Sequence, residues 1–192
     1  MRLDALDENV LVEERDDVLA ARAPQDFDAF AELYRRHLDR IYRFVRSQVP
    51  DNSTAEDLTA QVFFKALSSA GSFRGEAAYR SWLYRIAHNV VATWGRQRAR
   101  SPLVVEDLPE SEDPTPSPAT QAIAGEQREM VRAKVAELPP AQREVVALRY
   151  LEEFSIEEVA DVTDRSKGAV RILLHRARLR LRRSLEGKEL HR

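Results

Sequence analysis

The chain has 192 residues, which is enough for one or two domains of ordinary size. Its composition, with 43% hydrophobic and 32% charged residues, excludes collagen-like and wholly disordered chains. The absence of cysteine excludes disulfides, thiolate nucleophiles and cysteine metal sites. No apolar run approaches the ~20 residues that span a bilayer, and no hydrophobic signal core opens the sequence. We therefore expect a cytoplasmic protein without membrane insertion.

The charges are distributed unevenly, although the formal net charge is only -2. Residues 27–100 carry 12 basic and 7 acidic side chains, and residues 165–192 carry 10 basic and 2 acidic ones. By contrast, residues 1–26 carry 8 acidic and 3 basic side chains, and residues 101–120 carry 5 acidic and no basic ones. This alternation predicts two basic binding surfaces separated by acidic connectors.

The first half of the chain has the apolar periodicity of helices. One helix is predicted from Phe27 to an end near Pro50. A second is predicted to open at Ser53, because Ser53 and Glu56 have the spacing of a capping box. After a glycine-containing loop, a third helix is predicted over about residues 77–98.

Residues 101–120 separate the two halves and contain five prolines and no basic residue. Such a segment cannot form one helix and has little to bury, so we expect an extended linker. A polar helix is then predicted over residues 121–137, followed by an apolar helix that carries Val145 and Leu151.

The end of the chain has the pattern of a helix-turn-helix. Ser155 and Glu158 repeat the capping-box spacing at the start of a short helix. Asp164 is the expected left-handed residue of the turn, and Ser166 is the expected N-cap of a long basic helix. No period-2 pattern supports strands. We therefore expect an all-α fold of two small helical domains joined by a proline-rich acidic linker, the second a helix-turn-helix.

The last helix separates apolar from basic residues. The apolar face, predicted to pack on the preceding helix, consists of Val170, Leu174, Ala177 and Leu181. The arginines and the histidine of this helix lie outside the apolar face, where their side chains could enter a DNA major groove. A solvated basic helix is the simpler alternative, and the adjoining turn and caps weigh against it.

Aromatic and arginine side chains alternate between Phe73 and Asn89. This combination suits single-stranded nucleic acid, since bases stack on rings while guanidinium groups meet phosphates. Trp82 shares a helical register with Ile86, which favours a place in the core.

Several segments together resemble one known family. They are AEDLTAQVF at 55–63, the run 73–89, LPPAQREVVALR at 138–149, GAVR at 168–171 and HRAR at 175–178. In this order the chain resembles, from about residue 27 to 185, the extracytoplasmic-function (ECF) group of bacterial sigma factors in the sigma-70 family.

The resemblance implies a promoter-recognition subunit that joins core RNA polymerase, has no catalysis of its own and needs no cofactor or metal. It divides the chain into an acidic extension 1–23, a region 2 domain 24–100, a linker 101–122, a region 4 domain 123–187 and a tail 188–192. The implied partners are the β′ clamp and β flap of the polymerase, promoter DNA and an anti-sigma factor.

The resemblance also implies roles for individual residues. The −35 duplex would be contacted by Arg149, Ser166, Lys167, Arg171, Ile172, His175, Arg176 and Arg178. The melted −10 element, with one base flipped into a pocket, would be contacted by Phe73, Arg80, Arg85, Asn89, Thr93 and Arg96. The polymerase clamp would bind the helix that carries Asp57, Leu58, Gln61 and Phe64.

The chain departs from the family pattern at two places. Ile172 and Leu173 stand where the family usually has serine and arginine, so Leu173 could pack while Ile172 could touch a thymine methyl or a regulator. The usual glycine of the turn is also absent, which leaves its left-handed position to Asp164.

Three other classes of protein compete with this interpretation. An operator-binding helix-turn-helix regulator would explain the last helix but not the aromatic and arginine run. An enzyme lacks support, because the sequence has no H-E-x-x-H, phosphate-loop or G-x-S-x-G motif. A pure interaction module would not need two basic surfaces.

Overall fold

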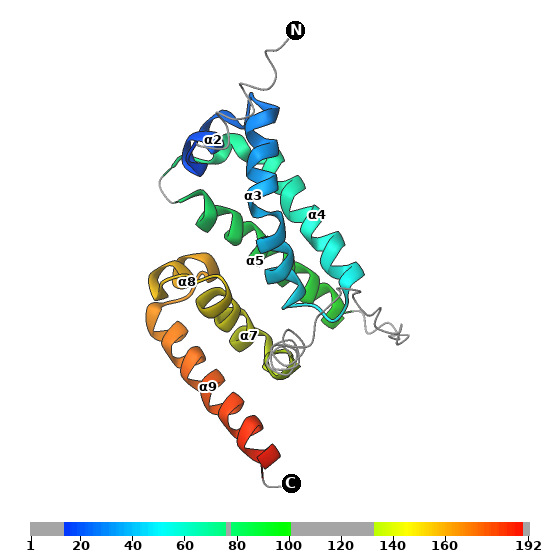
Figure 1. Cartoon of the computed structure of the whole chain (residues 1–192), viewed down its shortest axis with the longest axis vertical. Coiled ribbons are helices and arrows are strands. Elements are labelled where there is room, and N and C mark those ends of the chain that lie inside the picture. Colours follow the sequence, from blue (N-terminus) through cyan, green and yellow to red (C-terminus); the bar gives the residue numbers. More distant parts are fainter. Residues whose placement is uncertain (1–13, 76–77, 101–132, 190–192) are drawn as a thin grey trace, which may run out of the picture.

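The computed structural model describes residues 14–75, 78–100 and 133–189, and within these ranges every regular element is a helix. The predicted all-α fold is confirmed. Two groups of helices, before and after the proline-rich segment, form two small domains (Figure 1). The predicted linker, residues 101–122, lies outside the described residues. Among the helices that the structure describes, none has the length and apolar character of a membrane span.

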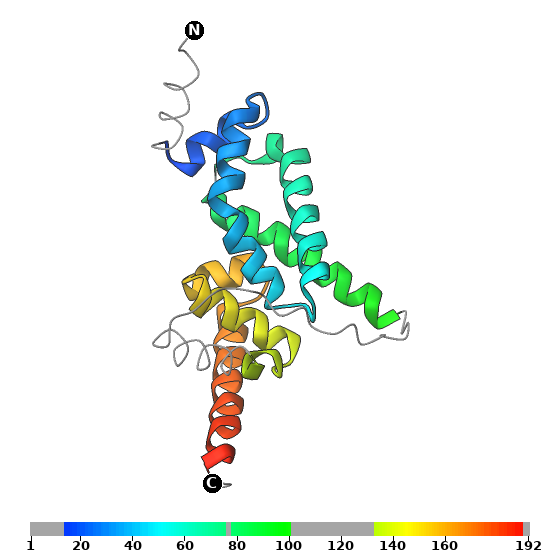
Figure 2. The ribbon, with the colours of Figure 1, turned by 45° about the vertical axis from the view of Figure 1, so that its right-hand side comes forward.

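The first domain packs its helices around one apolar core. Its elements are α2 (Asp16–Arg22), α3 (Phe27–Arg46), α4 (Asn52–Ser68), the short η1 (Ala70–Ser72) and α5 (Tyr79–Arg100). Helices α3 and α4 lie side by side, and α5 crosses them (Figures 1 and 2). The core centres on the fully buried Leu33, Ile41, Phe44 and Leu83.

Helix α2 falls within the predicted N-terminal extension but packs on the first domain. Leu19 is fully buried, and Asp16 joins α2 to α3: its Oδ1 accepts from Arg36 Nη1 at 2.8 Å, and its Oδ2 lies 2.7 Å from His37 Nε2. Asp17 Oδ1 accepts from the backbone N–H of Tyr79 at 3.0 Å, at the start of α5. Helix α2 therefore helps to fix where α5 begins.

The capping box predicted at Ser53 and Glu56 is wrong. The N-cap is Asp51, whose Oδ1 accepts from the backbone N–H of Thr54 at 2.7 Å, so Ser53 already lies inside α4. This backbone hydrogen bond, the largest of several effects, lowers the pKa of Asp51. An ionised carboxylate at a helix N-terminus is favoured by the helix dipole, which explains the earlier start.

The second domain begins with residues 133–136 in helical conformation, the described end of the polar helix predicted there. Its further elements are α7 (Pro140–Val146), the π-helix η2 (Ala147–Leu151), α8 (Ile156–Thr163) and α9 (Lys167–Glu189). The sequence predicts a continuous helix across α7 and η2, so the π-helical turn is a difference from the prediction. The backbone N–H of Phe154 then donates to Leu148 O at 3.0 Å and closes the loop before α8.

The caps predicted for the helix-turn-helix are confirmed. Ser155 and Glu158 form a capping box in which each side chain accepts from the other's backbone N–H. Asp164 is left-handed, with φ 51° and ψ 47°, and Ser166 Oγ accepts from the N–H of Ala169 at 3.1 Å. These bonds fix the angle at which α9 leaves α8.

The two domains are in contact, which the sequence does not predict. Helix α5 packs against α8, and α3 touches η2. Figures 1 and 2 show α7 and α8 lying between the first domain and α9. Helix α9 thus projects away from the first domain.

The left-handed turn generates a stability prediction. Asp164→Val places a β-branched residue at positive φ, which should cost about 1–2 kcal/mol of unfolding free energy. Asp164→Gly should be neutral or stabilising, because glycine adopts this conformation without steric cost. Urea unfolding measures both, and equal stability of the two variants would contradict the role assigned to the turn.

Candidate nucleic-acid interface

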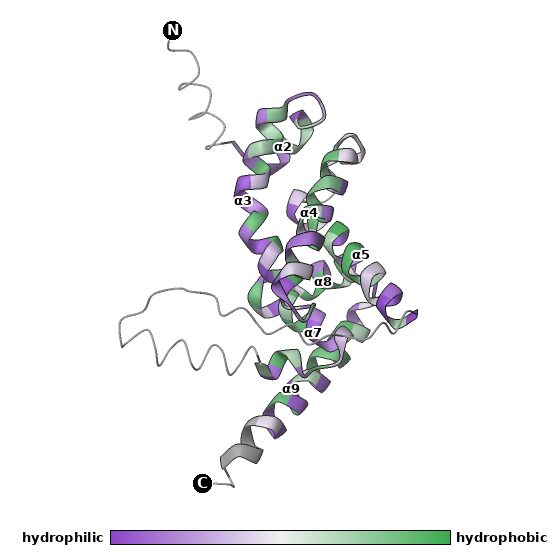
Figure 3. Cartoon of the chain, turned by 90° about the vertical axis from the view of Figure 1, so that its right-hand side faces the viewer, coloured by the Kyte–Doolittle hydropathy of each residue, from purple (hydrophilic) through white to green (hydrophobic). Residues whose placement is uncertain are grey.

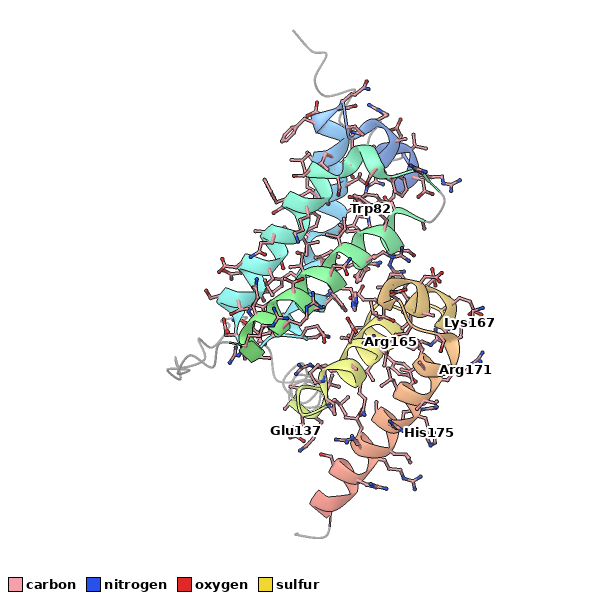
Figure 4. The ribbon with its side chains drawn as sticks, turned by 180° about the vertical axis from the view of Figure 1, so that it is seen from behind. Trp82, Glu137, Arg165, Lys167, Arg171 and His175 are labelled. Atoms are coloured by element: carbon pink, nitrogen blue, oxygen red, sulfur yellow. The ribbon has the colours of Figure 1, made fainter. Side chains whose placement is uncertain are left out.

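The outer side of α9 carries the largest group of exposed cations predicted to meet DNA. Arg171, His175, Arg176 and Arg178 are all exposed. Lys167, Arg171 and His175 project together on the side of α9 that faces away from the rest of the molecule (Figure 4). Hydrophilic and hydrophobic residues alternate along this helix (Figure 3), as expected of one packed and one solvated side.

The opposite side of α9 packs as predicted. Val170 and Ala177 are fully buried and Leu174 is 5% exposed, while Leu173 and Leu181 pack against the core from its edge. Ile172 is 54% exposed and lies among the cations rather than in the core. An exposed isoleucine there provides an apolar contact within an otherwise basic surface.

The start of α9 holds the predicted phosphate-binding residues. Ser166 and Lys167 are both exposed, although the Ser166 hydroxyl already caps the helix. Lys167 Nζ lies 2.8 Å from Glu157 Oε1, and this bond is the main cause of the lowered pKa of Glu157. A phosphate at this end would compete with Glu157 for the lysine.

Arg149 differs from the other residues predicted to contact the −35 duplex. It is only partly exposed, and its Nη1 donates to Phe154 O at 2.7 Å. This bond ties η2 to the loop before α8. The structure therefore gives Arg149 a positioning contribution to the helix-turn-helix.

Helix α4 exposes most of the residues predicted to bind the polymerase. Asp57 and Gln61 are exposed, and Phe64 is 72% exposed with the partly exposed Leu67 one turn further on. Leu58, however, is 4% exposed and belongs to the core of the first domain, which removes it from the predicted docking surface.

The aromatic residues after η1 form a cluster. The ring of Phe73 lies 5.7 Å from those of both Tyr79 and Trp82, in edge-on geometry. Trp82 is half-buried and packs against the core, in agreement with its helical register. The cluster leaves Phe73 half-buried at the start of α5.

The far end of α5 carries three more of the predicted −10 residues. Asn89 and Arg96 are exposed, and Thr93 lies between them, its Oγ1 accepting from Arg96 Nη2 at 3.1 Å. Positions separated by three or four residues share a helix face, so these polar groups form one stripe.

Two predicted −10 residues are instead held by the second domain. Arg80 Nη2 donates to the backbone carbonyl of Glu152 and lies 3.8 Å from its carboxylate, while the guanidinium stacks 4.1 Å from the ring centroid of Phe154. Arg85 Nη2 donates to Asp161 O at 2.6 Å.

Buried carboxylates complete this contact between domains. Glu152 accepts from the hydroxyl of Tyr84 at 2.5 Å, and burial, aided by the Glu152 charge, raises the pKa of Tyr84 well above 10.0, so the phenol stays a donor. Glu144 lies 2.5 Å from His88 Nδ1 and accepts from Arg165 Nη1 at 2.8 Å. Burial acts to raise the pKa of Glu144, but His88 and Arg165 together bring it below its ordinary value of 4.5.

Sequence patterns did not reveal these carboxylates. Glu144 stands among the apolar residues of α7, and Glu152 follows those of η2, so each could equally face solvent. The one sequence feature that could have indicated these two carboxylates is that each adjoins consecutive positions that are buried. The residues that the structure describes contain no cluster of metal-binding side chains.

Comparisons with known proteins identify both domains. Residues 33–101 match the family model described as Sigma-70 region 2, and residues 128–181 match Sigma-70, region 4. RNA polymerase sigma factor YlaC of Bacillus subtilis is 30% identical over 162 residues, covering 82% of this chain and 92% of YlaC. The chain is a member of the sigma-70 family. Among its relatives is the ECF sigma factor BldN of Streptomyces coelicolor, 32% identical over 78% of this chain and 58% of BldN, which supports assignment to the ECF group.

Two solved structures share the fold of this sigma factor. CnrH in complex with the cytosolic domain of CnrY has a TM-score of 0.68 at 24% identity, covering 91% of this chain and 99% of that one. RpoE in complex with the anti-sigma factor NepR from Bartonella quintana has a TM-score of 0.66 at 23% identity, covering 82% and 96%. Sigma factors direct RNA polymerase to promoters, and the chain has both domains for this task.

The lowered pKa of Glu144 predicts how the contact between domains responds to pH. A carboxyl whose folded pKa is depressed contributes stability above about 4.5, and this contribution is lost as the pH falls through the folded value. The difference in thermal midpoint between the unmodified protein and Glu144→Gln should therefore be largest near neutral pH and shrink as the pH falls below 4.5. Glu153→Gln, at an exposed position, is the control, and a pH-independent difference for Glu144→Gln would contradict the prediction.

Proposed function

We propose that this sigma factor reads two promoter elements with separate domains, residues 24–100 taking the melted −10 strand and residues 123–187 the −35 duplex. The observation that carries the proposal is α9, whose apolar side is buried in a helix-turn-helix while its other side exposes arginine and histidine. The competing class, an operator-binding regulator, would leave the exposed surface of α4 unexplained.

Recognition of the −35 element follows from the chemistry of α9. Arginine can donate two hydrogen bonds to guanine O6 and N7 in the major groove, and we assign this role to Arg171 and Arg176. His175 and Arg178 lie on the same exposed helix, and Ile172 offers an apolar contact to a thymine methyl. Ser166 and Lys167, at the helix start, set the register through phosphates.

Recognition of the −10 element relies on α5 and the segment before it. A base flipped from the duplex loses a few kcal/mol of stacking energy. Stacking on an aromatic side chain and hydrogen bonds to the base edge must compensate for this loss. We assign stacking to Phe73, hydrogen bonding to Asn89 and Thr93, and phosphate contacts to Arg96 together with Arg80 and Arg85. The exposed stripe on α5 supports this division.

Polymerase binding is assigned to α4. Asp57 and Gln61 would make polar contacts to the β′ clamp, and Phe64 would be the apolar anchor, since an aromatic side chain that is 72% exposed buries much area on docking. The second domain would meet the β flap, and residues 101–122 would connect the two domains.

We further propose that the chain acts in the cytoplasm, has no catalytic activity of its own and is controlled by an anti-sigma factor. The last point is supported by the NepR-bound neighbour, whose partner is named an anti-sigma factor. Membership of the sigma-70 family supports a recognition subunit rather than an enzyme.

Reconstitution with core RNA polymerase and promoter DNA tests the DNA assignments. Arg176→Ala should weaken −35 binding by about 1–3 kcal/mol, because it removes one base-reading guanidinium. Asn89→Ala should leave duplex binding intact and slow promoter opening, measured by permanganate reactivity of unpaired thymines. Arg43→Ala, an exposed arginine on α3, is the matched control. Normal transcription from both test variants would refute the site assignments.

Competition for core polymerase tests the α4 assignment. Phe64→Ser should cost about 2 kcal/mol or more of binding free energy, as expected of an aromatic anchor. Phe27→Ser on α3 is the matched control, since Phe27 is also 72% exposed. Equal effects of the two substitutions would show that Phe64 has no special role.

A further inference from the structure

Helix α2 is joined to two other helices of the first domain through adjacent acidic residues. Asp16 accepts from Arg36 Nη1 on α3 at 2.8 Å and lies 2.7 Å from His37 Nε2. Asp17 Oδ1 accepts from the backbone N–H of Tyr79, the first residue of α5, at 3.0 Å. Successive residues of a helix point about 100° apart, so the two carboxylates reach different neighbours. Helix α2 thereby fixes the start of α5 relative to α3.

The hydrogen bond between Tyr79 and Asp17 replaces a local N-cap of α5. Ala78 precedes the helix and has no side-chain oxygen. The first N–H groups of a helix have no partner inside it, and a side-chain oxygen of the preceding residue commonly satisfies one of them. A carboxylate at this end is also favoured by the helix dipole. Asp17 supplies both the acceptor and the charge from 62 residues earlier in the chain.

Tyr79 is also the buried member of the aromatic cluster. It is 3% exposed, and its ring lies 5.7 Å from that of Phe73 and 5.5 Å from that of Trp82. The ring of His37, which is bound to α2 through Asp16, lies 5.5 Å from Tyr79 on α3. Phe73 and Trp82 stay half-buried. The position of this partly exposed aromatic surface therefore depends on where Tyr79 is held.

Helix α2 contacts the elements on both sides of Phe73. The backbone N–H of Phe73 donates to Ala70 O at 3.1 Å and ends η1, which packs against α2. Helix α5, which follows Phe73, packs against α2 as well, and Trp82 lies in the part of α5 near its start (Figure 4). The fully buried Leu19 anchors α2 in the core of the first domain. The aromatic cluster is thus supported by a helix outside the matched region 2, which begins at residue 33.

We propose that α2 is a positioning element of the −10 surface and that Asp17 is its positioning residue, which caps α5 and so holds Phe73 where a flipped base can stack. This inference rests on the proposed function, because it concerns the stacking role assigned there to Phe73. Asp17 acts on the base through Tyr79 and Phe73 and needs no contact with DNA.

Two substitutions of Asp17 and one control test this role. Asp17→Ala removes the acceptor, whereas Asp17→Asn keeps a carbonyl oxygen at the same place and removes only the charge. Asp28→Ala is the matched control, because Asp28 is exposed and lies, like Asp17, in the first turn of its own helix. Circular dichroism of the full chain establishes that each variant is folded.

Amide hydrogen exchange at Tyr79, followed by NMR on the full chain, measures the cap directly. An N–H in the first turn of a helix has no partner inside the helix, so its protection depends on the capping group. Exchange at Tyr79 should be about tenfold faster in Asp17→Ala, as expected for the loss of a hydrogen bond to a carboxylate. Asp17→Asn and Asp28→Ala should stay close to the unmodified protein. Unchanged exchange in Asp17→Ala would refute the cap.

Single-strand binding by the holoenzyme, assembled from core RNA polymerase and the full chain, measures the effect on the base. Strands of the −10 element with one abasic position each identify the flipped base as the one whose removal weakens binding most. For the unmodified protein this weakening should be about tenfold, as for one stacked base. In Asp17→Ala it should fall to about threefold, because the displaced Phe73 ring stacks less well, and Asp17→Asn should restore most of it. Mere loss of folded protein would weaken the binding of all strands alike.

The outcomes distinguish this inference from the proposed function. If no abasic position weakens binding by the unmodified protein, the flipped-base pocket of the proposed function fails, and the positioning role fails with it. If the weakening is present and persists in full in Asp17→Ala while the Tyr79 amide exchanges freely, only the positioning role is refuted. A reduced weakening in Asp17→Ala, with Asp28→Ala unchanged, supports it.

Discussion

Tyr84 joins the cores of the two domains, and much of the arrangement depends on it. Its ring lies 5.4 Å from that of Phe44 in the first domain and 5.0 Å from that of Phe154 in the second, both edge-on. Its hydroxyl, kept protonated by burial, donates to Glu152. One side chain thus supplies apolar contact to both domains and satisfies a carboxylate that would be costly to bury alone.

The contact between the two domains engages part of the proposed −10 surface of α5. Near the start of α5, Arg80 and Arg85 each donate to a backbone carbonyl of the second domain, although Arg85 stays exposed, as Asn89 and Arg96 do further along. Helix α9 makes no such contact with the other domain, because its packing partners are α7 and α8 of its own domain. The two proposed DNA surfaces therefore differ: two arginines of the −10 surface bind the other domain, whereas α9 packs only within its own domain.

Features that depend only on residues close together in the chain could be predicted from the sequence. The two sides of α9, the capping box at Ser155 and the left-handed Asp164 all follow from helical periodicity and backbone sterics within a few residues. The cap predicted at Ser53 failed because the charged side chain of Asp51 accepts from the backbone N–H of Thr54 and starts the helix earlier. Leu58 was misjudged because an apolar residue beside polar ones can face either the core or a partner.

The contact between domains lay beyond these patterns, because it pairs charges far apart in the chain. Residues 121–164 carry 10 acidic and 5 basic side chains, and no local pattern indicates which of the acidic ones meet the first domain. In the structure, Glu144 and Glu152 from that stretch face His88 and Arg80 of the basic first domain. Part of the balance between acidic and basic residues that gives the chain its near-zero net charge is therefore made by pairs of opposite charge across the interface between the domains.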